Sequence, residues 1–378
     1  MTMKKAGLFL VLFFLSLCSC IKIDFFLFAN GQEESIEESY HGLPLYVGSS
    51  SPEWITGSSA SIEREIYLTP EGELIDPGDI GLHREYIHGC FLPSPINAPA
   101  DSCPLTGRNV TFLYAHGNSG GMFKYWYRAV SLWSMGANVF IFSYRGYGLS
   151  KGETTRASVK MDADAAATYL KSRKDIDTSR IIIYGYSMGA VTASYLSGTS
   201  AHRNTFAGTI LEAGLDSPEN IVEMSSGISF PGGFFLDTEP FNGPQFIKNT
   251  TKPVLHFHGQ KDTKVVPEQA KSYYEILKDH PGYTHHIGLR DEPMREWISE
   301  AVHGNLPFTA FSAPKQISDY WDYPGNEFHC CINPFEFEEE QFQSFLRDIG
   351  NTTGSEMSRT AAIYREFISG WVLRTFAW

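Results

Sequence analysis

A serine between two glycines heads the residues that could do chemistry. The run GYSMG, residues 185–189, follows the apolar run RIIIY and precedes the helical run AVTASYL. A G-x-S-x-G pattern between a strand and a helix is typical of a nucleophile elbow, a strained turn that presents the serine hydroxyl. The start of the helix favours negative charge that develops nearby. We therefore expect Ser187 to be a nucleophile in acyl transfer; the alternative is that it only caps the helix.

A second motif offers backbone hydrogen-bond donors. The run YAHGNSGG, residues 114–121, follows the apolar run NVTFL. A loop of this type supplies one N–H group to an oxyanion, and the residue after the nucleophile supplies the other. The candidates are the N–H of Asn118, or of its neighbour Ser119, and the N–H of Met188. His116 is expected to be structural, with its ring bonded within the loop.

The elements that must position these groups are short apolar runs that end at glycine or a turn residue. They alternate in the later part of the chain with helical stretches such as residues 158–171. Such a pattern predicts a mostly parallel sheet that is covered on both faces. Sites in these sheets form outside the carboxyl ends of the strands. This rule selects for inspection His116, Arg145, Ser187, Glu212 and Asp262.

Five motifs in one order resemble the α/β-hydrolase superfamily, in its serine-aminopeptidase-like and monoacylglycerol-lipase-like branch. They are the elbow, HGN, and the runs FSYRGYGLSKG (142–152), ILEAGLDS (210–217) and HGQKDTKVVP (258–267). The resemblance covers about residues 82–349. It implies an α/β-hydrolase fold, with a mostly parallel central sheet, helices on both faces and a short cap. It also implies a serine hydrolase that needs no metal and no organic cofactor.

The resemblance implies a catalytic acid in the loop after the seventh strand, which maps onto Asp262. A carboxylate there would accept a hydrogen bond from the base and stabilise the imidazolium. Asp216, after the preceding strand, is the alternative acid, and the other interpretation of Asp262 is a turn residue that caps the next helix.

The resemblance places the catalytic histidine after the last strand and before the final helix. His329 fits, because KQISDYWDYPGNEF reads as a strand and a turn before it, and EFEEEQFQSFLRDI reads as an amphipathic helix after it. Its spacing from Asp262 is longer than usual for the family. The alternatives are His303 and the pair His285 and His286, and the sequence shows no closing core strand before this pair.

The N-terminus reads as an export signal, with a basic start at Lys4 and Lys5 and then the apolar run GLFLVLFFLSL. The run LCSC that follows resembles a bacterial lipobox, with Cys20 as the lipidated residue. Cleavage after ANG (29–31) and an uncleaved anchor from Leu8 to Phe28 are the alternatives. All three put the folded part outside the cytoplasm, and the lipobox-like run predicts an exported protein of the cell envelope that lipidated Cys20 anchors to the membrane.

The interpretation of the remaining cysteines depends on the oxidising compartment that export implies. Cys90 and Cys103 flank a proline-rich loop that a disulfide could close, with two thiols as the alternative. Cys330 and Cys331 are interpreted as bystanders beside His329 and not as metal ligands. The net charge of −13 argues against nucleic acid as a partner.

The predicted organisation follows from these assignments. Residues 1–20 are the signal and residues 21–61 a polar tether. Residues 62–350 form the hydrolase domain, with a cap at about 213–240 and an insertion at about 279–314, and residues 351–378 form a C-terminal helix. The expected function is hydrolysis of an acyl-ester or lipid-like small-molecule substrate. Aminopeptidase or thioesterase activity is the alternative, and a catalytically inactive binding protein of the envelope is the rival from another class.

Overall fold

The computed structural model describes residues 24–28, 31–32, 62–95, 103–118, 120–220, 222, 239–258, 265–287 and 368–378. Their strands form a nine-stranded sheet in the order β11-β10-β9-β8-β5-β6-β4-β2-β3. The strands are β2 (Glu63–Leu68), β3 (Leu74–Ile75), β4 (Ile87–Leu92), β5 (Thr111–Ala115), β6 (Asn138–Ser143), β8 (Ile181–Tyr186), β9 (Gly208–Glu212), β10 (Val254–His258) and β11 (Tyr283–Ile287).

The sheet is mostly parallel, as predicted. The six strands from β11 to β6 pair in parallel, and β4, β2 and β3 continue the sheet with antiparallel pairs. Strand β5 lies between β6 and β8, and Ala115 at its end pairs with Gly185. The chain thus changes direction across the sheet at β5. The carboxyl ends of β5 and β8 meet at the switch point where such sheets place their sites.

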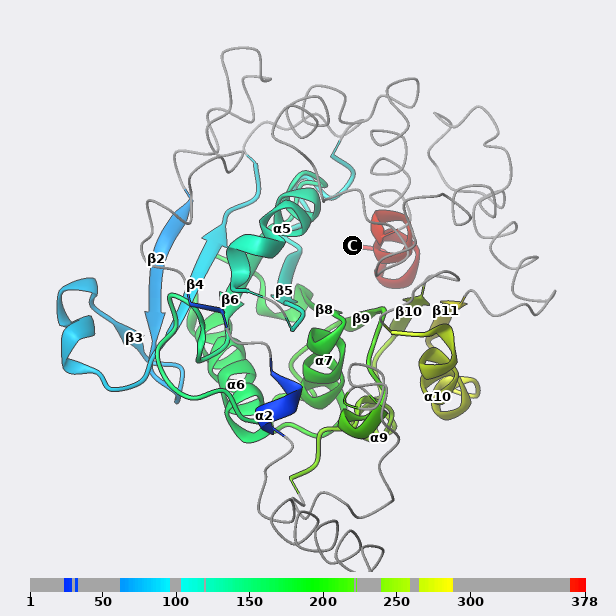
Figure 1. Cartoon of the computed structure of the whole chain (residues 1–378). Coiled ribbons are helices and arrows are strands. Elements are labelled where there is room, and N and C mark those ends of the chain that lie inside the picture. Colours follow the sequence, from blue (N-terminus) through cyan, green and yellow to red (C-terminus); the bar gives the residue numbers. More distant parts are fainter. Residues whose placement is uncertain are drawn as a thin grey trace, which may run out of the picture.

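Helices cover both faces of this sheet (Figure 1). Helix α5 (Trp126–Trp133) and the C-terminal helix, residues 368–376, lie on one face. The other face carries α6 (Arg156–Ser172), α7 (Met188–Gly198), α9 (Gly243–Ile247) and α10 (Pro267–Leu277). Each face has its own cluster of buried hydrophobic side chains. Fully apolar strands are required because both of their sides are buried.

Helix α6 shows how the local sequence fixes an element on the second face. The side chain of Thr155 accepts a hydrogen bond from the N–H of Ser158, and the Ser158 hydroxyl accepts one from the N–H of Thr155. This capping box satisfies N–H groups that have no partner within the helix. Small alanine side chains on its buried face let the helix pack closely on the sheet.

The N-terminal part of the described chain is packed onto the domain, so the predicted tether of 21–61 is wrong for residues 24–28 and 31–32. Helix α2 (Asp24–Leu27) is followed by β1 (Gly31–Gln32), which pairs in parallel with β7 (Tyr147–Gly148). Leu27 and Phe28 are buried in the core beneath α6 and α7. The sequence of this segment is apolar enough to be buried, and its partners lie more than 100 residues away.

The edge strand β11 corrects the predicted insertion at 279–314. Residues 283–287 pair in parallel with β10 and so belong to the central sheet. The two histidines in the run YTHHI interrupt the apolar pattern by which a buried strand is recognised in a sequence. Any insertion therefore begins after Ile287.

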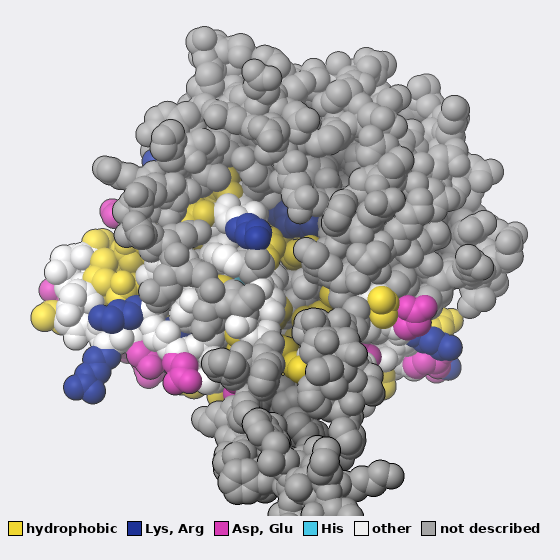
Figure 2. Space-filling view, viewed as in Figure 1, with side chains coloured by type: hydrophobic (Ala, Val, Ile, Leu, Met, Phe, Trp, Pro, Cys, Tyr) yellow, Lys and Arg dark blue, Asp and Glu magenta, His cyan; other side chains and the backbone are white. Residues whose placement is uncertain are grey.

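The described surface carries its charges unevenly. Figure 2 shows most of the described Asp and Glu side chains toward the lower left and lower right of one face, where Lys, Arg and hydrophobic side chains also lie, while hydrophobic and further basic side chains are visible nearer its centre. Within the described ranges, no helix combines the length and the apolar character of a membrane span. The apolar run of residues 7–17 and Cys20 lie outside those ranges.

Candidate active site

Ser187 occupies a strained turn at the end of β8. Its backbone has φ 55° and ψ −117°, a conformation that residues with a side chain rarely adopt. Such a residue costs on the order of 1–3 kcal/mol and persists only where the surrounding structure enforces it. Here the Ser187 N–H donates to the carbonyl of Glu212 at 2.9 Å, and the Ser187 carbonyl accepts from Ala190 at 3.0 Å. The strained turn predicted between the strand and the helix is therefore present, directly before the first turn of α7, and the role of Ser187 as a nucleophile stays a prediction.

The two glycines of the motif are required by the closeness of neighbouring backbone. A Cβ atom on Gly185 would lie 2.2 Å from the carbonyl oxygen of Gly189. A Cβ atom on Gly189 would lie 1.9 Å from the carbonyl oxygen of Ala115, at the end of β5. Any side chain at either position would force these elements apart. The start of α7 is thereby held against the loop that follows β5.

That loop carries Asn118, and its side chain is held from two sides. The Asn118 Nδ2 donates to the carbonyl of Leu27 in α2, and the Tyr147 hydroxyl donates to the Asn118 Oδ1. The neighbouring Gly117 lies close to the ring of Tyr186, because a Cβ atom there would be 3.2 Å from it. The loop of Asn118 therefore lies beside the elbow, where two backbone donors could serve one oxyanion.

His116 has the structural role expected for it. Its Nδ1 donates to the carbonyl of Gly117 at 2.7 Å, and its ring stacks on Tyr125 with centroids 5.3 Å apart. Burial lowers the pKa of His116 from 6.5 to about 4, so the ring is neutral at physiological pH. A neutral, fully buried ring within its own loop stiffens that loop.

A buried ion pair between Arg128 and Glu212 lies beside the elbow. Both oxygens of Glu212 accept from the Arg128 guanidinium, at 2.8 and 2.7 Å, and Oε2 also accepts from the Tyr184 hydroxyl. The Arg128 guanidinium also lies 4.0 Å from the ring centroid of Tyr186. Glu212 was selected from the sequence, whereas Arg128 was missed. The only signal for Arg128 was a cation within the apolar helical run of α5.

Arg145 lies in a separate ion-paired cluster and is structural. Its Nε donates to Asp162 at 2.6 Å, its N–H donates to the same carboxylate at 2.8 Å, and its guanidinium also pairs with Glu85. Burial raises the pKa of Asp162 to about 6, although the Arg145 charge opposes the shift. The cluster ties α6 to the turn after β6.

The predicted acid Asp262 lies outside the described residues, but both ends of its loop are described. Strand β10 ends at His258, and the His258 Nε2 donates to the carbonyl of Val265 at 2.6 Å. This bond joins the two ends of the segment that carries Asp262, at the carboxyl edge of the sheet. The flanks therefore agree with the loop that the family uses for its acid.

The alternative acid, Asp216, is already engaged. Its carboxylate accepts from the Ser217 N–H at 2.6 Å, from the Asn220 amide at 2.8 and 3.0 Å, and from the Ser272 hydroxyl at 3.1 Å. These bonds cap the turn after β9 and link it to α10. The Asp216 carboxylate thus has a structural task, and the choice of Asp262 over Asp216 as the catalytic acid stays a prediction.

Strand β11 bears on which histidine could be the catalytic base. His285 and His286 lie inside this strand, opposite His256 and Phe257 of β10. The sequence shows no closing core strand near the pair, whereas the structure places both histidines within β11 of the central sheet. A base that follows the last strand must come after Ile287. His303 and His329 meet this condition, and both lie outside the described residues, as do Cys330 and Cys331.

Cys90 and Cys103 are buried thiols, so the expected disulfide between them is not present in this structure. Cys90 lies within β4 and packs in the core with α5. A buried cysteine behaves there as a small hydrophobic residue, and this packing accounts for its position. Of the predicted cap at 213–240, residues 221 and 223–238 lie outside the described ranges.

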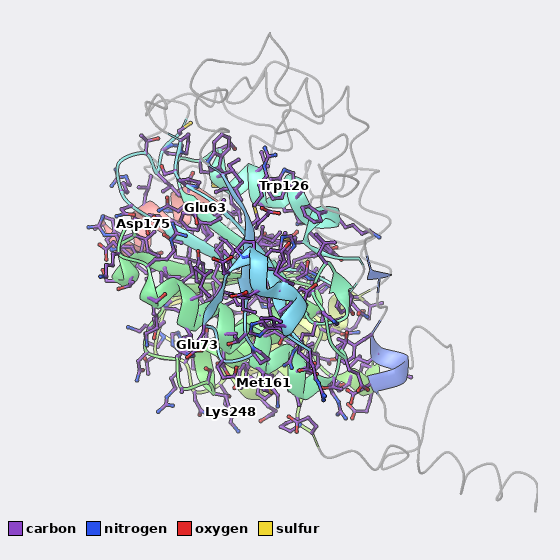
Figure 3. The ribbon with its side chains drawn as sticks, turned by 90° about the vertical axis from the view of Figure 1, so that its left-hand side faces the viewer. Glu63, Glu73, Trp126, Met161, Asp175 and Lys248 are labelled. Carbon is purple, nitrogen blue, oxygen red and sulfur yellow. The ribbon has the colours of Figure 1, made fainter. Side chains whose placement is uncertain are left out.

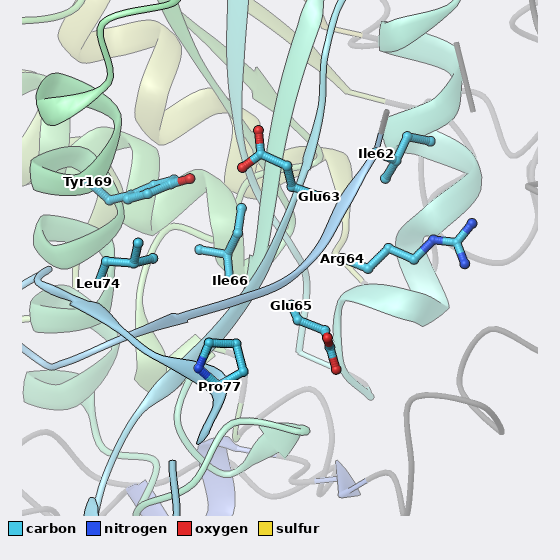
Figure 4. Close-up of a pocket in the computed structure, with 8 residues that line it drawn as sticks. All are labelled: Ile62, Glu63, Arg64, Glu65, Ile66, Leu74, Pro77 and Tyr169. Atoms are coloured by element: carbon cyan, nitrogen blue, oxygen red, sulfur yellow. The ribbon is translucent and has the colours of Figure 1, made fainter. Parts of the chain in front are cut away.

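A surface pocket beside β2 and β3, near one edge of the sheet, is separate from the elbow at the centre (Figure 4). Its lining comes from the β2 region and α6: Ile62, Glu63, Arg64, Glu65, Ile66, Leu74, Pro77 and Tyr169. Strand β2 is four strands away from β8, or about 19 Å at the usual spacing of strands. Figure 3 shows Glu63 and Asp175 near this edge, where Arg173 pairs with both. The pocket is therefore not part of the candidate active site.

The strand order, the elbow after β8 and the loop after β5 together define an α/β-hydrolase fold. Relatives agree with this class. The family described as Chlamydia CHLPS protein (DUF818) matches residues 112–205, which contain both Asn118 and Ser187. The α/β hydrolase domain-containing protein WAV2 of Arabidopsis thaliana is 30% identical over 177 residues, or 44% of this chain and 58% of that protein.

Two further proteins are similar to this chain. The uncharacterized protein YfhR of Escherichia coli K12 is 28% identical over 194 residues, or 51% of this chain and 64% of YfhR. This chain thus spans less than two-thirds of the length of YfhR and of WAV2. Among solved structures, the esterase Pf2001 of Pyrococcus furiosus is similar over 64% of this chain and 91% of that chain, with 20% identity and a TM-score of 0.43.

Proposed function

We propose that this protein is a serine hydrolase that cleaves a carboxylic ester through an acyl-enzyme. The observation that carries the proposal is Ser187 in a strained turn, directly before α7 and beside the loop of Asn118. A protein that only needed a turn here would have no reason to hold a serine in an unfavourable conformation. The backbone donors on both sides of the hydroxyl match the needs of acyl transfer.

The proposed reaction has two steps. The Ser187 Oγ attacks the ester carbonyl carbon while His329 accepts its proton, and the N–H groups of Met188 and Asn118 stabilise the oxyanion. His329 then gives the proton to the leaving alcohol as the C–O bond breaks. Water, deprotonated by His329, attacks the acyl-enzyme and releases the acid, and Ser187 regains its proton. Asp262 would hold the imidazole and stabilise its charged form.

His303 is the competing base, because it also follows β11. The two assignments are separated by paired variants. His329→Ala should lower kcat by several orders of magnitude while His303→Ala stays near wild type. The opposite pattern would transfer the role of base to His303 and leave the roles of Ser187 and Asp262 unchanged.

An acyl-ester or lipid-like substrate is the proposed class, and the N-terminal segment supports it. Cys20 precedes Asp24 by four residues, which span at most about 14 Å when extended. If Cys20 is lipidated in the cell envelope, as its lipobox-like sequence suggests, the bond from Asn118 to Leu27 would place the site close to the membrane surface. Esters with long acyl chains are concentrated there.

Substrate class is tested with p-nitrophenyl esters of graded chain length and with aminoacyl p-nitroanilides. The proposal predicts ester turnover that Ser187→Ala abolishes. Preferential turnover of the anilides would favour an aminopeptidase, and turnover of acyl thioesters alone would favour a thioesterase. A folded wild-type protein that hydrolyses none of these would favour a binding protein of the envelope.

A further inference from the structure

The N-terminal segment, residues 24–28 and 31–32, lies against the loop that would supply the second oxyanion donor. Its helix α2 is only four residues long and cannot be stable by itself. Leu27 is 2% exposed and Phe28 is 9% exposed, although both belong to a segment that precedes the domain in the sequence. Contacts with distant parts of the chain must therefore hold the segment in place.

The first of these contacts is an ion pair at the start of α6. One oxygen of Asp24 accepts from the Arg156 Nε at 2.8 Å and from the Arg156 N–H at 3.1 Å. Arg156 is the first residue of α6, so the carboxylate also lies at the positive end of a 17-residue helix. Both side chains are largely buried, at 2% and 11% exposure. Asp24 thus fixes the segment to the domain by charge.

Arg156 also connects the segment to the chain that follows the cap region. Its guanidinium donates to the carbonyl of Glu239 at 2.6 Å. Close by, the rings of Phe28 and Phe241 meet edge to face with centroids 6.0 Å apart. The segment is therefore held between α6 and residues 239–241.

The last contact reaches the loop itself. The Leu27 carbonyl accepts from the Asn118 Nδ2, and the other end of the same amide accepts from the Tyr147 hydroxyl. Tyr147 belongs to β7, which pairs with β1 of the segment. Both ends of the Asn118 side chain are thus set by the N-terminal segment and its pairing partner.

We propose that residues 24–28 and 31–32 are a positioning element of the active site, in which Asp24 fixes the segment and the Leu27 carbonyl orients Asn118. The inference rests on the proposed function, because it concerns the backbone N–H of Asn118 as an oxyanion donor. The segment touches no reacting atom. It sets the angle of a donor that acts most strongly in the transition state, where small misplacement lowers the rate.

The kinetic test uses Asp24→Ala, with Glu63→Ala as the matched control. Glu63 also pairs with an arginine, Arg173, but at the far edge of the sheet. Asp24→Ala should lower kcat about tenfold with KM within twofold of wild type, because the oxyanion forms only in the transition state. Affinity for a trifluoromethyl ketone that mimics the oxyanion should fall by the same factor. The control should change neither quantity.

Conservative variants separate positioning from general damage. Asp24→Glu should recover most of kcat, and Tyr147→Phe should lower kcat less than Asp24→Ala does, with little loss of thermal stability. If Asp24→Ala and Tyr147→Phe both keep wild-type kcat and ketone affinity, the segment has no positioning role although the hydrolase proposal stands. If the wild-type protein neither hydrolyses esters nor binds the ketone, both proposals fail together.

A second test does not depend on activity. The segment can position Asn118 only if processing leaves it attached, so the mature protein must begin at Asp24 or earlier, and the lipobox-like run predicts a start at Cys20. Intact mass of the full-length protein, purified from the envelope of a bacterial host, should give that start. A mature protein that begins at Gln32, after cleavage at ANG, would overturn the positioning role and leave the triad unaffected.

Discussion

Two regions of the sheet, around the central strand β8 and around β2, use similar residues in opposite ways. Around β8, the ion pair of Arg128 and Glu212 is buried, with side chains 5% and 0% exposed, and Ser187 has a strained backbone. Around β2, Arg173 pairs with Glu63 and Asp175, whose side chains are 45% and 58% exposed. Buried ions and strain are costly, and they persist where the fold over-determines them. Around β8 a buried ion pair and a strained serine occur together, and this supports the proposal that the region carries the function.

The largest expected effect separates the two regions by activity. Ser187→Ala should lower ester turnover by roughly 10⁶-fold, as in other triads, which corresponds to about 8 kcal/mol of transition-state stabilisation. Thermal stability should stay the same or rise, because the nucleophile is selected for chemistry and not for packing. The check is a progress curve with a p-nitrophenyl ester beside a melting curve. Residual turnover above 1% would mean that another residue is the nucleophile.

The buried pair should give the largest change in stability. Arg128→Met leaves the Glu212 carboxylate buried without its cation, and the free energy of unfolding should fall by about 3–5 kcal/mol. The double variant Arg128→Met/Glu212→Leu removes both charges and should recover part of that loss. Urea unfolding of the three proteins measures both effects. If Arg128→Met costs less than 1 kcal/mol, the pair is no more important than a surface pair.

We expect one buried histidine in each region to make a similar contribution to the pH dependence of stability. Burial lowers the pKa of His88, beside β2, and of His116, beside the elbow, from 6.5 to about 4. Between these values the unfolded chain binds protons that the folded protein does not, so stability falls as the pH falls. From pH 7 to pH 5 each histidine should remove about 2 kcal/mol. Urea unfolding at both pH values should show that His88→Asn has a shallower loss than wild type; an unchanged loss would contradict the burial argument.

The smallest effect is expected at the β2 edge. Glu63→Ala breaks an ion pair that is half exposed, and such pairs contribute about 0–1 kcal/mol. Its melting temperature should fall by no more than a few degrees, and ester turnover should not change. A loss of turnover in this variant would show that the region around β2 affects catalysis, and the functional difference between the regions around β8 and β2 would no longer hold.

Local patterns were sufficient for the elbow and most of the sheet. GYSMG predicts the turn because a serine between glycines, placed after an apolar run and before a helical one, is a local signal, and the apolar strands are recognisable because both sides of each are buried. His116 was correctly interpreted as structural from its place in the loop. These features depend on neighbours in sequence, which a pattern can show.

The parts that were missed depend on distant partners. Asp24 and Arg156 are 132 residues apart, and no local signal shows that a segment next to an export signal will pack onto α6. Arg128 meets Glu212 across 84 residues. Strand β11 was missed because its two histidines interrupt the apolar pattern, while hydrogen bonds to β10 hold it in the sheet.

The most direct test of the central claim is covalent labelling with a fluorophosphonate, followed by peptide mass spectrometry. We expect one adduct per chain, on the peptide that contains Ser187, and no adduct on folded Ser187→Ala. A folded wild-type protein that stays unlabelled, or an adduct on another residue, would contradict the proposal that the elbow of β8 presents the catalytic nucleophile.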